Sequence, residues 1–127
     1  MIKTYSAAVT TTGSAGSASG STIQQCTPPI NGFYLGAYYD FHASAPGATT
    51  DTTIQFHGGG NPSFVLTNSA TDGFRPSRIQ AALNTDGSAI SGVYEMHPID
   101  ASGFTVSLAQ CDALTNAVVV YIFVLET

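Results

Sequence analysis

The clearest hydrophobic pattern in the chain is a strict alternation that begins at Phe33. One set of residues is apolar and the other is more polar: Phe33, Leu35, Ala37, Tyr39 and Phe41 against Tyr34, Gly36, Tyr38, Asp40 and His42. A period of two places successive side chains on opposite faces of a strand, so one face is expected to be buried. The alternation returns at Ile54 and Phe56, after the turn-rich sequence SAPGATTD. We therefore predict that residues 33–56 form a β-ribbon with a loop at its tip.

Other segments have the same extended character. Threonine-rich residues 2–12 and 17–26 favour strands because branched Cβ atoms fit the pleat of a sheet, and GSAG between them predicts a hairpin. Alternatively, residues 4–22 form an arm that wraps a neighbouring subunit. Further strands are predicted at residues 63–67, 79–83, 89–97, 104–108 and 117–125. The last is apolar on both faces, which is typical of a central strand or a subunit interface.

Turn residues separate the predicted strands. The Pro28–Pro29 pair is expected to interrupt pairing, and Asn31–Gly32 to reverse the chain. Pro98 is expected to end a strand, residues 68–76 to be irregular, and residues 100–103 to turn. No segment has the capped apolar stripe of a helix. Short strands every 8–12 residues or so predict one all-β domain over residues 1–127, an antiparallel β-sandwich with jelly-roll-like connections.

Charge is unusually scarce and restricts the kinds of partner. Only 9% of residues are Asp, Glu, Lys or Arg, against about 25% in an ordinary soluble protein. A surface so poor in charge loses little solvation on contact, which suits a protein largely covered by partners. A secreted or virion-exposed all-β protein would have a similar composition. The net charge is −5, and the three cations Lys3, Arg75 and Arg78 are too few for a phosphate-binding stripe. We therefore expect neither nucleic acid nor an anionic membrane as a partner.

Targeting signals are also missing from the sequence. The first residues, MIKTYSAAVTTTG, have no apolar core of a secretory signal, so we expect synthesis in the cytoplasm of the host cell. The longest apolar run, residues 117–125, is about half the length of a membrane-spanning helix. Cys26 and Cys111 permit a disulfide, but buried free thiols are the favoured reading.

Candidate catalytic residues are few. On a paired ribbon, four side chains would lie close enough for a metal or an acid–base pair: Asp40, His42, Asp51 and His57. No HxH or HxxxH spacing supports a metal, and the alternative is a solvated or interface-facing polar side of a sheet. No serine lies in GxSxG, and GGGNPS at residues 58–63 lacks the GK[ST] ending of a phosphate loop. We expect a non-enzymatic protein with no metal and no cofactor.

Aromatic and arginine side chains are the better candidates for a contact surface: Tyr34, Tyr38, Phe74, Arg75 and Arg78. Together with Tyr94, the tyrosines are expected on an outward face, where they anchor an interface or stack on sugars. Each arginine is either a bidentate anchor to a carboxylate or a solvated loop residue. Arg75→Ala is expected to weaken assembly without unfolding the protein, as sedimentation with particles would test.

The segment PINGFYLGAYYDFHASAPGATTDTTIQF resembles a pattern in small virion-associated proteins of tailed bacteriophages. There, a Thr/Ser/Gly-rich hairpin leads through a turn to a strand, an ASAP–TTD loop and another strand. The resemblance covers roughly residues 4–57 and, more loosely, the strands beginning at Gly103 and Ala117. Gly47 lengthens the loop relative to that pattern.

Such proteins are similar to head decoration (cement) proteins, which lie outside an icosahedral shell and brace adjacent capsid subunits. The resemblance implies a non-enzymatic, oligomeric protein on the capsid surface, with the major capsid protein as its partner. It implies no catalytic residues. The alternative is a tail, fibre or head-surface module that recognises host glycans, and an enzyme is the third hypothesis.

Overall fold

The computed structural model describes residues 1–44, 46–58, 61, 63–76, 81–83, 86, 88–94 and 97–126. All regular structure in these residues is β-strand: β1 (Ile2–Val9), β2 (Ala18–Phe41), β3 (Asp51–Phe56), β4 (Ser63–Leu66), β5 (Gly73–Pro76), β6 (Ala81–Leu83), β7 (Ala89–Tyr94), β8 (His97–Cys111) and β9 (Val118–Glu126). Within the same residues there is no helix of the length and apolarity that crossing a membrane requires. The predicted all-β fold is confirmed.

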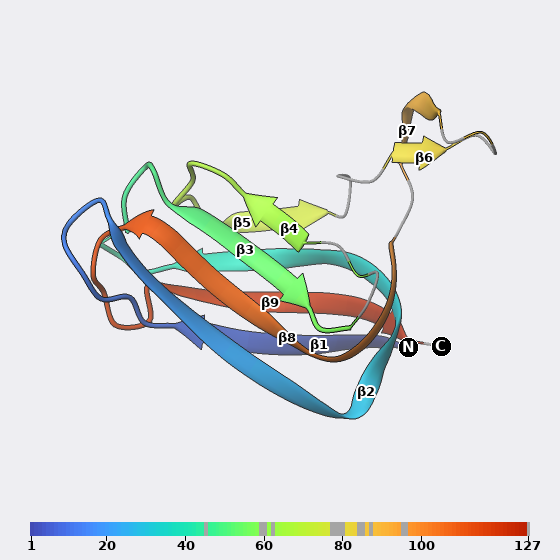
Figure 1. Cartoon of the computed structure of the whole chain (residues 1–127), viewed down its shortest axis with the longest axis horizontal. Helices are drawn as coiled ribbons and strands as arrows, with labels where there is room; N and C mark the ends of the chain where they lie inside the picture. The colour runs from blue at the N-terminus through green and yellow to red at the C-terminus, as the bar shows by residue number, and fades with distance from the viewer. Residues whose placement is uncertain are drawn as a thin grey trace.

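Seven strands form one antiparallel sheet that folds over into two layers. Its order is β1-β9-β2-β8-β3-β4, and β5 pairs with β2. Residues 18–25 and 30–34 of β2 pair with β8, and residues 32–41 pair with β9, so the long bent β2 belongs to both layers. Figure 1 shows β8 and β3 in front of β9 and β1. We call these the β8 layer (residues 18–25 of β2, with β8, β3 and β4) and the β9 layer (β1, β9, residues 32–41 of β2, and β5).

This arrangement confirms the antiparallel β-sandwich. The first strand pairs with the last and the second with the next to last, which is the nested pairing of jelly-roll-like folds. Side chains of the two layers meet in the middle, where the Tyr5 ring of β1 lies 6.3 Å from Phe104 of β8 and Tyr34 of β2 lies 5.6 Å from Phe56 of β3.

The core contains the apolar residues that point inward from both layers. The largest fully buried side chains are Phe56, Phe104, Ile30, Ile54, Leu108, Ile122, Val9, Val106, Val118, Val120, Val124 and Thr50. The predicted inward face of residues 104–108 is therefore confirmed. So is the central position of residues 117–125, because β9 lies between β1 and β2.

The alternation in β2 reverses at a β-bulge. The register of β2 on β9 shifts between Tyr34 and Gly36, where Gly36 has a φ of +143°. An extra residue in one strand moves every side chain before it to the other face. Tyr34 is consequently only 2% exposed and Phe33 is 37% exposed, whereas Ala37 is buried as predicted. The prediction that Phe33 points inward and Tyr34 outward is wrong.

The predicted ribbon of residues 33–56 is also wrong, because β2 and β3 are not neighbours. β8 lies between them and pairs with both. Residues 73–76, predicted to be irregular, form β5 along residues 36–39 of β2.

The predicted turns at Asn31–Gly32 and residues 100–103 are strand instead. β2 and β8 continue through them, and β8 includes Pro98. A Cβ at Gly103 would overlap the carbonyl oxygen of Gln24, so this glycine serves the close approach of two strands and not a turn. The expected interruption at Pro28–Pro29 is confirmed, because no residue between Gln25 and Ile30 of β2 pairs with β8.

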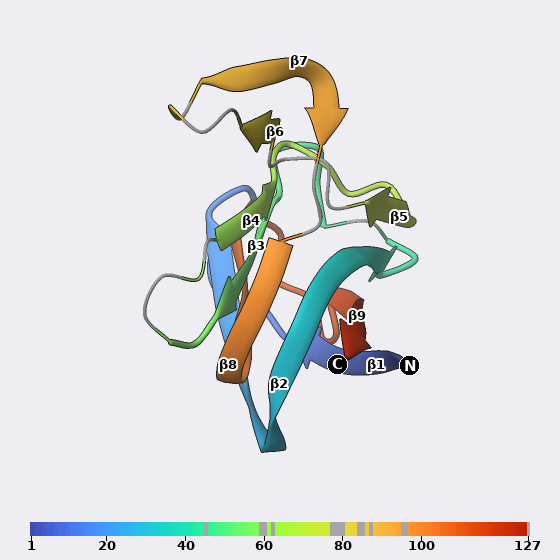
Figure 2. The ribbon, with the colours of Figure 1, turned by 90° about the vertical axis from the view of Figure 1, so that its right-hand side faces the viewer.

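The two predicted N-terminal strands are present, but they do not pair with each other as a hairpin would: β1 pairs with β9 and the start of β2 pairs with β8. β1 pairs along its whole length with β9 of the same chain, and a bridge joins Thr12 to Ser19 at the start of β2. β6 and β7 form a separate two-stranded sheet, which projects from the sandwich in Figures 1 and 2. The predicted strand at residues 79–83 is described only from Ala81 onward, and residues 95–96 of the strand predicted at 89–97 lie outside the described residues.

Candidate contact surface and edge pocket

The proposed acid–base residues do not come together. Asp40 and His42 lie at one end of β2, whereas Asp51 begins β3 and His57 directly follows it, on the far side of β8. Each of three has a local partner: the His42 Nδ1 accepts a hydrogen bond from Ser44 N–H at 3.0 Å, Asp51 accepts from Asn68 N–H at 2.9 Å, and the His57 Nε2 lies 2.7 Å from the Thr105 hydroxyl. Among the described residues, no three His, Cys, Asp or Glu side chains gather as metal ligands would.

Both cysteines are free thiols, as favoured from the sequence. Cys111 is buried and donates a hydrogen bond to the Ala18 carbonyl at 3.1 Å, and Cys26 is partly exposed farther along β2. Burial raises the pKa of both thiols, so both are poor nucleophiles at neutral pH. Residues 59, 60 and 62 of the GGGNPS loop lie outside the described residues.

Aromatic side chains form a row on the outer face of the β9 layer. Tyr38 of β2 pairs with Tyr121 of β9 on one side and Phe74 of β5 on the other, so the three share one face. They are 39%, 37% and 48% exposed, respectively. The Phe74 ring also lies 6.0 Å from Phe123 and covers Gly36, where a Cβ would come within 2.7 Å of its Cζ.

The apolar surface continues toward the ends of the chain. Leu125 pairs with Ile2 and with Phe33, and both of these are exposed. We call the following set the outer aromatic face: Ile2, Phe33, Tyr38, Phe74, Tyr121, Phe123 and Leu125. Among the described positions on this side of the layer, Asp40 carries the only charge; the others are Thr4, Ser6, Ala8, Gly36, Pro76 and Val119.

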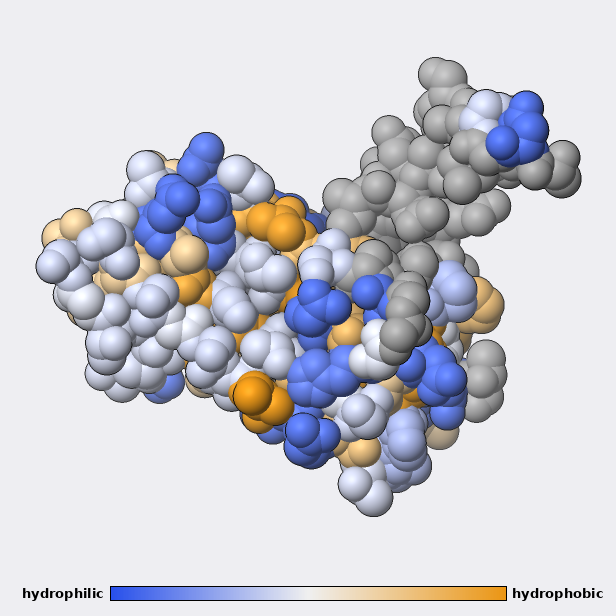
Figure 3. All heavy atoms as spheres, in the orientation of Figure 1, coloured by the Kyte–Doolittle hydropathy of each residue, from blue (hydrophilic) through white to orange (hydrophobic). Residues whose placement is uncertain are grey.

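The opposite surface of the sandwich is rich in hydroxyl groups, although it also exposes Ile23 and Val65. On the outside of the β8 layer, Ser21 of β2 pairs with Ser107 of β8, and Ser107 pairs with Thr53 of β3. Figure 3 shows this side of the molecule, where weakly polar and hydrophilic residues predominate and apolar patches are scattered. The two outer faces therefore differ in composition: the β9 layer presents a row of aromatic rings, whereas the β8 layer presents mainly hydroxyl side chains with isolated aliphatic ones.

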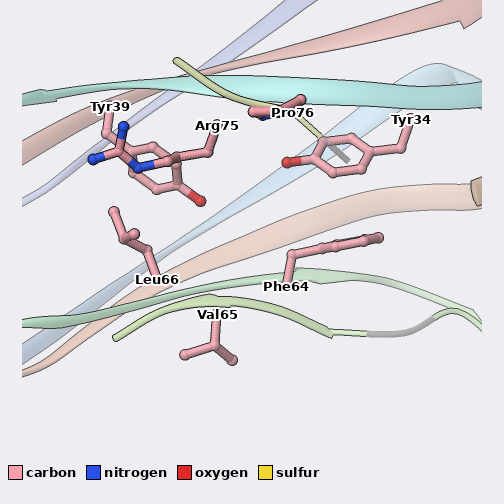
Figure 4. Close-up of a pocket in the computed structure, with 7 residues that line it drawn as sticks. All are labelled: Tyr34, Tyr39, Phe64, Val65, Leu66, Arg75 and Pro76. Carbon is pink, nitrogen blue, oxygen red and sulfur yellow. The ribbon is translucent and has the colours of Figure 1, made fainter. Parts of the chain in front are cut away.

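Arg75 and Tyr34 lie at a pocket rather than on the outer aromatic face. Because Phe74 points outward from β5, Arg75 points the other way, toward the open edge where β5 and β4 face each other. There a cavity of about 220 Å³ is lined by Tyr34, Tyr39, Phe64, Val65, Leu66, Arg75 and Pro76 (Figure 4). Tyr34 is thus a pocket residue, and the prediction that it belongs to an outward contact face is wrong.

The pocket keeps its two phenols neutral. Burial raises the pKa of Tyr34, and burial raises the pKa of Tyr39 to about 12, although the Arg75 guanidinium partly opposes the second shift. A neutral phenol donates a hydrogen bond, so the cavity combines apolar walls with two hydroxyl donors and one cation.

The raised pKa of Tyr39 predicts a loss of stability at alkaline pH. Tyr39 ionises near pH 10 in the unfolded chain and near 12 in the folded one, so its stabilising contribution is complete below pH 10 and disappears between about pH 10 and 12. Urea unfolding across this range should show that Tyr39→Phe loses less stability than the wild type. Tyr121→Phe, which removes an exposed hydroxyl, is the control; equal losses in wild type and Tyr39→Phe would contradict the assignment.

Two of the five contact residues predicted from the sequence, Tyr38 and Phe74, lie together on the outer aromatic face. Arg78 lies outside the described residues, as does the side chain of Tyr94. Comparison of the chain with known protein families, with characterised proteins and with solved structures gives no match. The sequence reasoning missed Tyr121 and Phe123, although the apolar residues on both faces of β9 were a usable signal.

Proposed function

We propose that the chain is a non-enzymatic structural protein of a phage virion, a decoration protein that binds the outside of the head through its outer aromatic face. The observation that carries the proposal is the contrast between the two outer faces of the sandwich. One is aromatic and bears a single charge, at Asp40, among its described positions, and the other is rich in serine and threonine.

The chemistry of the two faces supports this orientation. When a partner binds, aromatic rings on a regular sheet bury large apolar areas with little loss of side-chain entropy. Aromatic residues also dominate the energetics of protein interfaces. The hydroxyl-rich β8 layer suits contact with water. The partner is the major capsid protein, and each bound copy adds the same stabilising contact to the symmetric shell.

The proposal predicts that one charge on the outer aromatic face prevents binding. Tyr121→Lys places an ammonium group where the partner would bury it, and an unpaired charge there costs enough to weaken binding about 10-fold or more. Ser21→Lys adds the same charge to the outside of the β8 layer and should bind normally. Heads prepared without the protein are mixed with each variant, sedimented, and the bound copies counted by quantitative mass spectrometry.

The same measurement separates the alternatives. Normal binding by Tyr121→Lys, or equal loss in both variants, contradicts the outer aromatic face as the contact. Copies in the hundreds per particle support decoration, whereas a handful supports a tail position. Absence from the particle overturns a virion role, and saturable binding of a glycan through Tyr38 and Tyr121 would assign the face to sugar recognition instead.

A further inference from the structure

The pocket at the open edge of the sandwich has the size and lining of a small-molecule site. An enclosed apolar cavity of about 150 Å³ is enough to hold a benzene molecule, so 220 Å³ has room for an aromatic ring with a short substituent. Most of its lining is apolar: Phe64, Val65, Leu66 and Pro76, with the ring faces of both tyrosines. Phe64 and Tyr34 are in ring contact at 4.3 Å, so the end of the pocket that they form is aromatic.

Three polar groups line this apolar space, and none of them has a hydrogen-bond or ion-pair partner among the residues that the structure describes. Figure 4 shows the Tyr34 and Tyr39 hydroxyls directed toward the middle of the pocket, with the Arg75 guanidinium beside the Tyr39 ring. Tyr34 is only 2% exposed, yet neither hydroxyl is hydrogen-bonded to any described residue. Arg75 likewise forms no ion pair with a carboxylate in the described part of the chain.

We propose that this pocket binds an aromatic ring that carries a carboxylate. The ring would pack against Phe64 and Leu66, and the carboxylate would accept hydrogen bonds from the Arg75 guanidinium and from a tyrosine hydroxyl. Arginine matches a carboxylate in a bidentate geometry, and a few directed polar groups in an apolar cleft are the usual composition of a ligand site. This ligand is independent of the capsid contact, which lies on the other side of β5.

The probe for this proposal is phenylacetate, with phenylacetamide as its neutral isostere. Titration of the labelled protein by two-dimensional NMR should shift the amides of residues 34, 39, 64–66 and 75, with a Kd of roughly 1 mM for a ligand of this size. The amide should bind about 10-fold more weakly, because it cannot form the charge-assisted pair with Arg75. Equal affinity for the two probes, or shifts confined to other residues, would overturn the proposal.

Substitutions of Arg75 and Lys3 test which cation binds the carboxylate of phenylacetate. Arg75→Gln should weaken phenylacetate binding about 10-fold and remove the preference over phenylacetamide. Lys3→Gln removes the same charge from a residue that lies over the Tyr5 ring, far from the pocket, and should leave both affinities unchanged. Arg75→Lys keeps the charge but loses the bidentate fork, so an intermediate affinity is expected. Loss of the preference in Lys3→Gln, or its retention in Arg75→Gln, contradicts the site.

The same chemistry also occurs at the C-terminal phenylalanine of a peptide. N-acetyl-glycyl-phenylalanine with a free carboxylate is therefore titrated alongside phenylacetate. Tighter binding of the peptide assigns the pocket to a chain end, and tighter binding of phenylacetate assigns it to a free molecule. Failure of both probes to bind overturns the pocket proposal and leaves the capsid contact of Tyr121 untouched.

Discussion

Phe56→Ala should lower the free energy of unfolding by about 3–5 kcal/mol, whereas Phe33→Ala should lower it by less than about 1 kcal/mol. Phe56 is fully buried, and its ring centroid lies 5.6 Å from that of Tyr34, 5.9 Å from Phe64 and 6.3 Å from Phe104. Truncation leaves a cavity among these rings, which can close only in part. Phe33 is on the outer aromatic face and leaves no cavity.

Urea denaturation of the two variants measures this difference directly. The pair is matched in chemistry and differs only in the face that each residue occupies, so it also tests the β-bulge at Gly36. Equal destabilisation by the two substitutions would mean that Phe33 is inside the sandwich, and that the strict alternation of residues 33–41 holds after all.

The second large effect is expected at Gly36 itself. A Cβ there would come within 2.5 Å of the Arg75 carbonyl oxygen and 2.7 Å of the Phe74 ring, at a backbone φ of +143° that L-residues rarely adopt. Gly36→Ala therefore combines backbone strain with a collision against β5, and we expect a loss of about 2–4 kcal/mol. The variant should also displace β5, which carries Phe74 and Arg75.

The Gly16→Ala variant separates the cost of backbone strain from the cost of the collision with β5. Gly16 also has a positive φ, of +79°, but a Cβ at this position would contact nothing within 4 Å. Its replacement should cost only the backbone term, about 1 kcal/mol. Denaturation curves for both variants, with amide chemical shifts of residues 73–76, provide the comparison; equal losses would show that the approach of β5 to Gly36 contributes nothing.

The sequence predicted strands well wherever a period of two ran without interruption. Residues 104–108 and 117–125 have a continuous inward face, and the structure confirms both segments. The exchange of faces by Phe33 and Tyr34 could not be predicted from the sequence, because a bulge depends on how two strands pair. Nothing in the local sequence distinguishes a glycine that forms a bulge from one on a polar face.

Turn signals failed for a related reason. Asn31–Gly32 and residues 100–103 have turn composition, but their glycines allow strands to approach closely, with Gly32 against Leu125 and Gly103 against Gln24. The predicted ribbon of residues 33–56 is wrong because β3 pairs with β8, which is distant in the sequence, and not with β2, which precedes it. The aromatic row could not be predicted for the same reason: Tyr38, Phe74 and Tyr121 lie side by side only because of the registers of three paired strands.

The pairing of β1 with β9 has a consequence for the timing of synthesis. β9 separates β1 from β2 in its layer, so neither strand has its full set of main-chain partners until β9 has emerged from the ribosome. Folding that depends on contacts so distant along the chain is slow, and edges that wait for a partner are prone to self-association. The row that joins Tyr38 to Tyr121 consequently cannot form before β9 has been synthesised, so the complete aromatic surface is not presented to a partner until then.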